Sequence, residues 1–273
     1  ERGNALTDLP LRSVSQLNQY VRCPMNYKLA RIDKVWARPA AWLPQGTAFH
    51  AVAEAYEKRL SEGLTMSLDE ARDLFRQEYA DGIGELCDGT PNLDWWFWSG
   101  PYNGERDIER RYHIGLEQVD KFIAWRESPG QTIWVAPDGT PAIELAFKIE
   151  LDGILVRGFI DAVVVVDGEL RVRDYKTGNS PGDDFQLGVY AVAIETLYGN
   201  KPSSGDYFMA GKKGKPAKPT AVYDLSHWTR DKVSERFHEV EVQIQAGNFE
   251  ALPEPDKCSF CDVNLSCPVF HGA

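Results

Sequence analysis

The spacing of hydrophobic and polar positions changes about halfway along the chain. In the first part, apolar residues recur every three or four positions, the period of a helix with one buried face. This spacing predicts helices over residues 13–30, 47–60, 68–80 and 106–125. Ser13 or Ser15 suits the cap of the first helix and Thr47 that of the second, whereas Ser67 and Glu70 form a capping box before the third.

Between Ala142 and Lys176 the pattern becomes that of β-strands. Asp152-Gly153 and Asp167-Gly168 separate runs rich in β-branched residues. Asp-Gly is typical of the two-residue loop of a β-hairpin, so we expect three consecutive antiparallel strands. The rest of the chain predicts a loop over 84–104, a helix over 184–198, strands near 206–210 and 220–225, a helix over 229–246, and an irregular tail from 253.

The two Asp-Gly loops fix a register between these strands. If each pair forms the loop of its hairpin, Glu144 lies directly opposite Asp161, and Asp161 lies directly opposite Asp174. Three neighbouring strands then present three carboxylates side by side on one face. A β-bulge near Gly158 would shift this row by one residue and break the alignment.

A row of carboxylates on adjacent strands is unfavourable unless a cation lies among them. Directly opposed side chains have Cβ atoms roughly 4.5–5.5 Å apart, and like charges there repel. Hard cations such as Mg²⁺ and Mn²⁺ prefer this kind of ligand set. Lys176 lies two residues beyond Asp174 and shares its face, where an ammonium could contact a phosphate or activate a water. The alternative is a set of solvent-facing charges on an ordinary meander.

Composition and charge narrow the class of protein. The hydrophobic fraction of 43% and charged fraction of 26% are those of a soluble globular protein. The sequence has neither an apolar run of transmembrane length nor the layout of a signal peptide, so we expect a cytoplasmic protein without membrane contact. A net charge of −11 argues against a broadly basic nucleic-acid coat but is compatible with acidic metal ligands beside a local basic track.

Several short motifs occur together in one order. Gly46-Thr-Ala-Phe-His50 comes first, then Glu144, then Gly158-Phe-Ile-Asp161, then Asp174-Tyr-Lys176-Thr-Gly178, and finally Gln186-Leu-Gly-Val-Tyr190. Each is weak alone, but the ordered set, spanning about residues 46–190, resembles the RecB-like branch of the PD-(D/E)XK nucleases. The resemblance implies an α/β fold with a restriction-endonuclease-like core, in which helices flank a mixed sheet.

The resemblance also implies roles for individual residues. His50, Asp161, Asp174 and the backbone carbonyl of Tyr175 would ligate the catalytic metal, and Glu144 would bind a metal or a water nearby. Lys176 would assist the attacking water. Gln186 and Tyr190, which share a helix face, would position the DNA or the active-site strands. The group of Glu144, Asp161, Asp174 and Lys176 is thus the expected catalytic set.

The cysteines suggest a second cofactor. The chain has five, and an odd number in an apparently intracellular protein argues against a disulfide framework. Cys258, Cys261 and Cys267, with the distant Cys23, are similar to the arrangement that holds a [4Fe–4S] cluster in the iron–sulfur members of this branch, among them AddB-type nucleases and CRISPR-associated RecB-like exonucleases. Zinc on four cysteines is the rival interpretation. Cys87 is left over.

These observations predict a single nuclease domain over residues 1–273. Its core covers about 40–61 and 140–226, a helical insertion covers about 62–130, and an iron–sulfur staple joins residue 23 to 258–267 in the C-terminal tail. The insertion includes Trp95-Trp-Phe-Trp98, which suits either stacking on unpaired bases or packing within the insertion.

The expected function is metal-dependent hydrolysis of DNA, by an exonuclease more than an endonuclease. We expect a single-stranded or end-containing substrate in recombination, repair, phage DNA metabolism or CRISPR adaptation. The sequence contains no GxxxxGK[ST] motif, so a separate helicase, or a recombination or CRISPR adaptation protein, is an expected partner. Alternatives are a non-catalytic DNA-end-binding or scaffold subunit that retains the fold, and an iron–sulfur DNA glycosylase.

Overall fold

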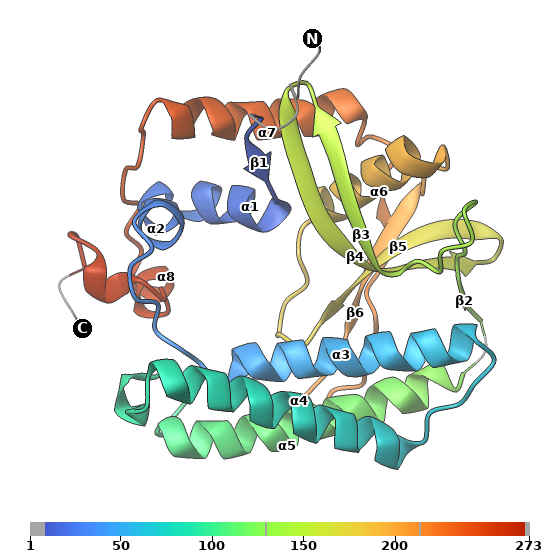
Figure 1. Cartoon of the computed structure of the whole chain (residues 1–273), viewed down its shortest axis with the longest axis horizontal. Helices are drawn as coiled ribbons and strands as arrows, with labels where there is room; N and C mark the ends of the chain where they lie inside the picture. Colours follow the sequence, from blue (N-terminus) through green and yellow to red (C-terminus); the bar gives the residue numbers. More distant parts are fainter. Residues whose placement is uncertain (1–8, 129, 213, 271–273) are drawn as a thin grey trace, which may run out of the picture. The chain divides into compact units, whose positions relative to one another are not determined.

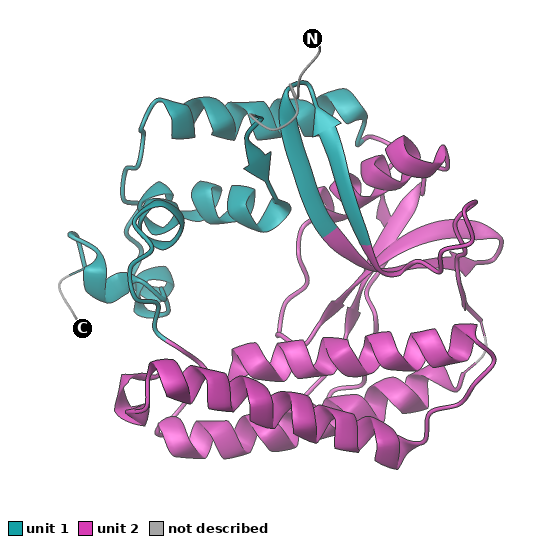
Figure 2. Ribbon diagram, in the orientation of Figure 1, with its two compact units in different colours: residues 1–38, 146–158, 228–273 teal, residues 39–145, 159–227 magenta. Residues whose placement is uncertain are grey.

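The computed structural model describes residues 9–128, 130–212 and 214–270. The chain divides into two compact units, shown in different colours in Figure 2. Unit 1 comprises residues 1–38, 146–158 and 228–273, and unit 2 comprises residues 39–145 and 159–227. The single-domain organisation expected from the sequence stays a prediction.

Helices dominate the first half of the chain, and a run of strands then follows before the next helix (Figure 1). The helices are α1 (Val14–Arg22), α2 (Pro24–Tyr27), the π-helix η1 (Lys28–Ile32), α3 (Trp42–Ser61), α4 (Leu68–Gly89), the 3₁₀ helix η2 (Leu93–Trp95), α5 (Gly104–Arg126), α6 (Asp184–Tyr198), α7 (Arg230–Gln245), α8 (Pro255–Ser259) and the 3₁₀ helix η3 (Asn264–Ser266). The strands are β1 (Leu11–Arg12), β2 (Thr132–Ile133), β3 (Ile143–Leu151), β4 (Ile154–Val166), β5 (Glu169–Lys176), β6 (Ser204–Met209), β7 (Lys218–Pro219) and β8 (Tyr223–Asp224).

The strong local signals of the sequence are confirmed. Both Asp-Gly loops form as predicted, with positive φ at each aspartate and each glycine, the backbone that a tight hairpin turn requires. Helix α6 has the predicted bounds, and the capping box of Ser67 and Glu70 is present at α4. Ser13 caps α1 by accepting from the backbone of Gln16.

Three helix boundaries differ from the prediction, and the strand expected near 220–225 is observed only as β8, with β7 before it. Helix α3 begins five residues before Thr47, whose hydroxyl bonds to the carbonyl of Leu43 inside the helix instead of capping it. The predicted first helix breaks at Cys23, where Pro24 starts a new helix. Helix α4 continues to Gly89, so the first part of the predicted 84–104 loop is helical.

Eight strands of the described chain form one mixed sheet. Its main path runs β1-β4-β5-β6-β7, while β2 and β3 also pair with β4 and β8 pairs with β6. Strands β4 and β5 are antiparallel, with Ala162 opposite Arg173 and Val166 opposite Glu169, the register predicted from the second Asp-Gly loop. Strands β5 and β6 are parallel. A mixed sheet with helices is therefore observed, as the sequence led us to expect.

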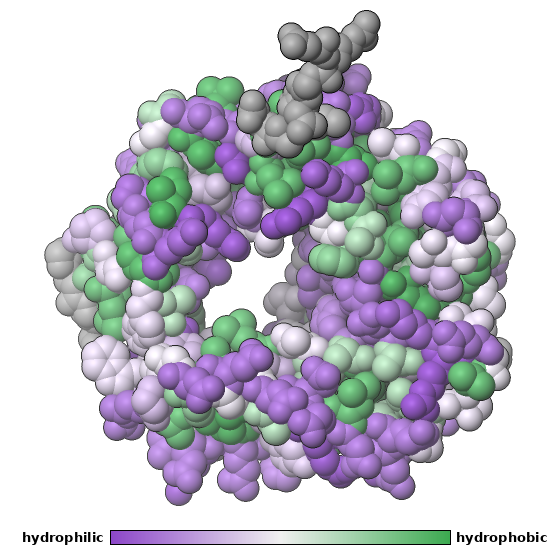
Figure 3. Space-filling model, in the orientation of Figure 1, coloured by the Kyte–Doolittle hydropathy of each residue, from purple (hydrophilic) through white to green (hydrophobic). Residues whose placement is uncertain are grey.

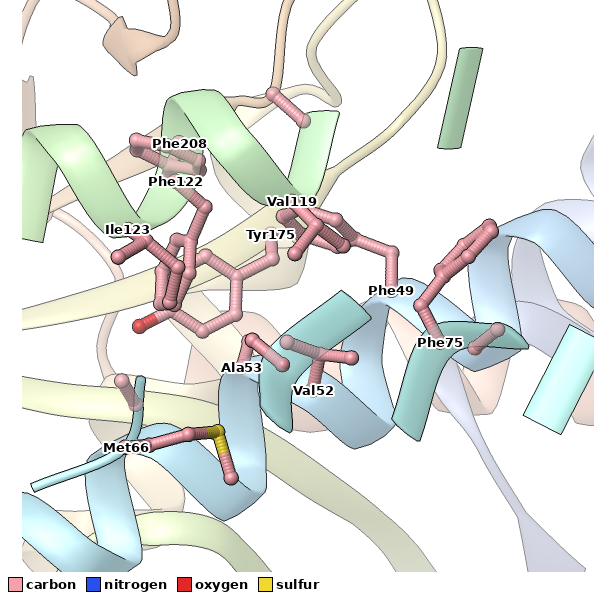
Figure 4. Packing of buried hydrophobic residues seen from close by; sticks show 14 of the residues in the cluster. Phe49, Val52, Ala53, Met66, Phe75, Val119, Phe122, Ile123, Tyr175 and Phe208 are labelled. Carbon is pink, nitrogen blue, oxygen red and sulfur yellow. The ribbon is translucent and has the colours of Figure 1, made fainter. Parts of the chain in front are cut away.

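In unit 2, helices α3, α4 and α5 pack side by side as a helical trio (Figure 1). Aromatic rings join this trio to the sheet. Phe49 of α3 and Phe122 of α5 contact Tyr175 of β5, and Phe122 also contacts Phe208 of β6, at centroid distances of 5.7–6.5 Å. Figure 4 shows this cluster. Because the rings are buried, they fix α3 against the strand that carries Asp174 and Lys176.

Helix α6 packs against β5 and β6 and has almost no exposed apolar residue in its central turns. In unit 1, helix α1 packs against α7. Arg12 makes a bidentate ion pair with Glu241, and the rings of Tyr20, Tyr27 and Phe249 contact one another. Each unit therefore has its own buried contacts.

The described helices are all too short or too polar to cross a membrane. Figure 3 shows mainly hydrophilic residues over α4, whose first turns alternate acidic and basic side chains. Helix α4 thus presents a polar outer surface and packs its buried residues against α3 and α5.

Candidate metal centre

Three potential metal ligands from separate elements meet in unit 2. His50 comes from α3, Glu144 from the start of β3 and Asp161 from β4. One ligand atom from each lies within 4.8 Å of the other two. His50 Nδ1 is 3.6 Å from Glu144 Oε1 and 3.6 Å from Asp161 Oδ1. Imidazole nitrogen and carboxylate oxygen are ligands that a divalent cation accepts, so this group can hold a metal.

The backbone at Glu144 explains how its side chain joins the group. Glu144 has φ +44°, a left-handed conformation that is uncommon for a residue other than glycine. The first predicted hairpin register is consistent with the bond from the Val163 amide to the Ala142 carbonyl, just before this point. The direction of the Glu144 carboxylate therefore depends on this local backbone conformation and not on strand alternation alone. Such conformations cluster at functional sites.

An open groove borders the group on the side of α3. Gly46, Thr47, His50, Ala51, Glu54 and Glu144 line it. Apart from His50 and the two glutamates, these are small side chains. The groove leaves a face of the candidate metal ligands accessible to a substrate from solvent.

Asp161 is nearly buried and held from the neighbouring strand. Its Oδ2 accepts a 2.6 Å hydrogen bond from the backbone amide of Tyr175, while its Oδ1 faces His50. The Tyr175 ring lies in the aromatic cluster, so the strand that donates this bond is itself fixed. Asp161 therefore has one oxygen occupied by the protein and one directed to the candidate metal position.

Asp174 lies beside this group without joining its 4.8 Å set. Lys176 Nζ is 2.7 Å from Asp174 Oδ2, and Gln186 Nε2 donates to Asp174 Oδ1 at 2.8 Å. Gln186 also donates to the hydroxyl of Tyr190 at 2.7 Å, so the two residues share a face of α6 and turn it toward the acid. The Lys176 ammonium lies 5.4 Å from the ring centroid of Tyr207.

The close packing of acids and imidazole changes their proton affinities. Burial lowers the pKa of His50, but the Glu144 carboxylate 3.6 Å away and the charges of Asp161 and Asp174 outweigh it and raise the pKa to about 9. Burial and the Asp174 carboxylate raise the pKa of Asp161 to about 7, against the opposing charge of His50. Burial also raises the pKa of Asp174, although Lys176 opposes the shift. Without a cation, the group retains protons at neutral pH.

The structure thus brings together most of the residues that the sequence singled out for catalysis. His50, Glu144 and Asp161 form one group, and Asp174, Lys176, Gln186 and Tyr190 form a hydrogen-bonded set beside it. The Tyr175 carbonyl as a ligand stays a prediction. Two buried glutamines were not anticipated: Gln118, which donates to the carbonyl of Thr177, and Gln45, which donates to Gln118. Glutamine on an amphipathic helix gives no distinct sequence signal.

The four predicted cluster cysteines meet in unit 1. Cys23, Cys258, Cys261 and Cys267 line one apolar pocket with Asn26, Leu29, Leu252, Pro253, Val263 and other side chains. All four are half-buried and free of disulfides, as is Cys87. Asn26 Nδ2 lies 3.1 Å from the sulfur of Cys261, and the Glu254 amide lies 3.4 Å from that of Cys258. Burial raises the pKa of the Cys261 thiol.

A mixed sheet that carries an Asp-x-Lys strand next to His, Glu and Asp side chains is the layout of a metal-dependent nuclease. Residues 12–268 match the family model described as "PD-(D/E)XK nuclease superfamily". The chain belongs to this superfamily, whose members are nucleases that use divalent metal ions.

Two phage proteins are similar over nearly the whole chain. The "Gene 69 protein" of Mycobacterium phage L5 is 71% identical over 284 residues, covering 97% of this chain and 98% of that protein. The "Gene 69 protein" of Mycobacterium phage D29 is 72% identical over 263 residues, with 96% and 98% covered. A solved structure described as "Crystal structure of SSO0001" is similar at a TM-score of 0.39 and 14% identity, covering 96% of this chain and 87% of that one.

Proposed function

We propose that this chain is a RecB-like, metal-dependent DNA nuclease that hydrolyses phosphodiester bonds at DNA ends. The observation that carries the proposal is the convergence of His50, Glu144 and Asp161 within 4.8 Å, next to the Asp174–Lys176 pair. Three partly buried acids this close together are fully ionised only when a cation lies among them, and the imidazole binds such a cation in its neutral form. Metal binding in a nuclease of this superfamily would explain why these side chains lie together.

In this proposal His50, Asp161 and Asp174 hold Mg²⁺ or Mn²⁺, with the Tyr175 carbonyl as a further ligand. When bound, the cation polarises the phosphate and favours hydroxide formation from water. Glu144 accepts from the attacking water or binds a cation itself. His50 and Glu144 line the open groove, and Asp161 lies in the same close group of ligand atoms.

The remaining polar residues have supporting roles. Gln186 fixes the rotamer of Asp174 by donating to one of its oxygens. Lys176, next to Asp174, would place a positive charge beside the phosphate, which the acids would otherwise repel. A protein with net charge −11 repels DNA as a whole, so a bound cation and Lys176 supply the local attraction that the substrate needs.

The choice of an exonuclease rests on the ordered motif set, which resembles end-processing members of the RecB-like branch. The relatives from two mycobacteriophages support a place in phage DNA metabolism, with recombination, repair and CRISPR adaptation as the other settings. A helicase or a recombination or CRISPR adaptation protein would supply an unwound end.

We further propose a [4Fe–4S] cluster held by Cys23, Cys258, Cys261 and Cys267. The fit is good in three respects: four thiols share one apolar pocket, none is in a disulfide, and two sulfurs receive N–H hydrogen bonds of the kind that tune such clusters. The cluster would join α2 to the C-terminal tail and stabilise unit 1. Zinc on the same thiols is the competing assignment.

The nuclease proposal is tested with linear DNA labelled at either end, single- or double-stranded, in a time course with Mn²⁺, Mg²⁺ or chelator. We expect progressive shortening from an end that needs the metal and is lost in Asp174→Ala. Firm DNA binding without cleavage in any metal would instead favour the DNA-end-binding scaffold, and release of free bases without strand scission would favour a glycosylase.

The cluster is tested by metal analysis of protein prepared without oxygen. We expect a brown protein with about four iron atoms per chain. A colourless preparation with one zinc per chain and no iron would overturn the assignment.

A further inference from the structure

A buried chain of polar side chains links the helical trio to the backbone just after Lys176. Gln118 of α5 donates from Nε2 to the carbonyl of Thr177 at 3.1 Å. Its Oε1 accepts from Gln45 Nε2 at 2.7 Å, and Gln45 Oε1 in turn accepts from Arg111 at 3.3 Å. Each amide group of both glutamines thus has a protein partner.

This glutamine chain is unusually well enclosed. Gln118 and Gln45 are 0% and 1% exposed. Arg111, which supports Gln45, is held by Asp107 and by the hydroxyl of Ser99 at 2.8 Å. Apolar side chains at the glutamine positions would pack α3 against α5 without removing two amides from water. What the amides provide, and apolar groups cannot, is a directed bond to the Thr177 carbonyl.

A hydrogen bond to the Thr177 carbonyl orders the backbone just after strand β5. Strand β5 ends at Lys176, whose own carbonyl accepts from the amide of Ala210 on the neighbouring strand. One residue later the sheet no longer provides a partner, and Gln118 does. The bond therefore extends the ordered backbone past the end of the strand at the point where the Lys176 side chain must be aimed.

Helix α3 approaches the same residue. Gly46 follows Gln45 directly, and a side chain at Gly46 would come within 3.5 Å of the Thr177 hydroxyl. His50 lies one helical turn further along α3. Gln45 and Gln118 consequently fix the end of the Lys176 strand relative to the helix that carries His50.

We infer that Gln118, supported by Gln45, is a positioning residue that aims Lys176 at the scissile phosphate. The inference rests on the proposed nuclease function and adds to it a role for the helical trio. Loss of the bond lets the Lys176–Thr177 backbone move, which reduces the rate of the chemical step more than the binding of metal or DNA. Gln118 itself contacts neither.

The test compares Gln118→Met and Gln45→Met with Tyr79→Phe. The methionines keep the side-chain length and remove the polar chain. Tyr79→Phe is a matched control, because it removes a hydrogen bond between α4 and α5, from the Tyr79 hydroxyl to the Ile108 carbonyl at 2.7 Å, and leaves both glutamines in place. We expect kcat to fall about tenfold in Gln118→Met, and less in Gln45→Met, with KM and Mn²⁺ affinity unchanged. The control should keep the wild-type kcat.

A second readout does not depend on catalysis. Amide hydrogen exchange of the peptide covering residues 174–180 should become faster in Gln118→Met and stay unchanged in Tyr79→Phe. Unchanged exchange in Gln118→Met, or an equal loss of kcat in Tyr79→Phe, would overturn the inference. Absence of cleavage by the wild-type protein would refute the proposed function, while the exchange measurement would still decide whether Gln118 holds this backbone.

Discussion

The affinity of the candidate metal centre for Mn²⁺ should depend steeply on pH. A cation binds deprotonated carboxylate and neutral imidazole, so any proton on these groups must leave first. In the cation-free protein the pKa of Asp161 is raised to about 7 and that of His50 to about 9. Both raised pKa values affect Mn²⁺ binding in the same direction. They keep protons on the ligands at neutral pH, so the affinity for Mn²⁺ rises as pH rises.

The magnitude follows from the two values. Below pH 7 both Asp161 and His50 carry protons, so affinity should increase about a hundredfold per pH unit. Between about pH 7 and 9 only the proton on His50 remains to be displaced, and the increase should be about tenfold per unit. The rise should level off above the pKa of His50.

Isothermal titration of Mn²⁺ in buffers with different ionisation enthalpies measures both the affinity and the protons released. We expect between one and two protons released per cation near neutral pH, and one fewer in His50→Ala. An affinity that is constant between pH 6 and 8, or binding without proton release, would show that the cation does not displace protons from these ligands.

Three further outcomes follow from the same structure. Gln186→Leu removes the bond to Asp174 and should lower kcat about tenfold at unchanged melting temperature, in steady-state cleavage assays. Phe159 is 61% exposed two residues before Asp161, so we expect Phe159→Ala to raise KM for single-stranded DNA about tenfold through lost base stacking, while Phe159→Tyr keeps the wild-type value. Cys261→Ser should lose iron and melt at a lower temperature, whereas Cys87→Ser, outside the cysteine pocket, should change neither. Equal iron content in both cysteine variants would contradict the cluster assignment.

Features set by local chemistry could be predicted from the sequence. The Asp-Gly loops need only their own positive φ angles and the runs on either side, and they fixed the register of β4 and β5. Helix α6 is similarly local, since it begins after Asp183 and ends at Gly199 in a left-handed conformation.

Features that depend on distant contacts could not be predicted from the sequence. Helix α3 begins at Trp42, whose ring stacks with Phe97 from a segment far along the chain, so the cap expected at Thr47 was wrong. The left-handed backbone of Glu144 departs from strand alternation, and no residue type near it in the sequence indicates this conformation. Gln45 and Gln118 look like ordinary polar positions of amphipathic helices until α3 and α5 are packed together.

The candidate site lies between these cases. Asp161, Asp174 and Lys176 follow from strand register, because pairing and alternation are local rules. His50 came from a motif resemblance alone, and its approach to Asp161 depends on how the helical trio packs on the sheet. The orientation of Asp174 toward Gln186 depends on α6 in the same way.

We propose that His50, Asp161 and Asp174 together hold the catalytic cation. The most direct test is a crystal grown or soaked with Mn²⁺, examined by anomalous scattering at the manganese edge. We expect an anomalous peak within coordination distance of a His50 nitrogen and of oxygens from Asp161 and Asp174, and its loss in Asp161→Asn. A protein that cleaves DNA with Mn²⁺ bound at other side chains, and with these three left unligated, would contradict it.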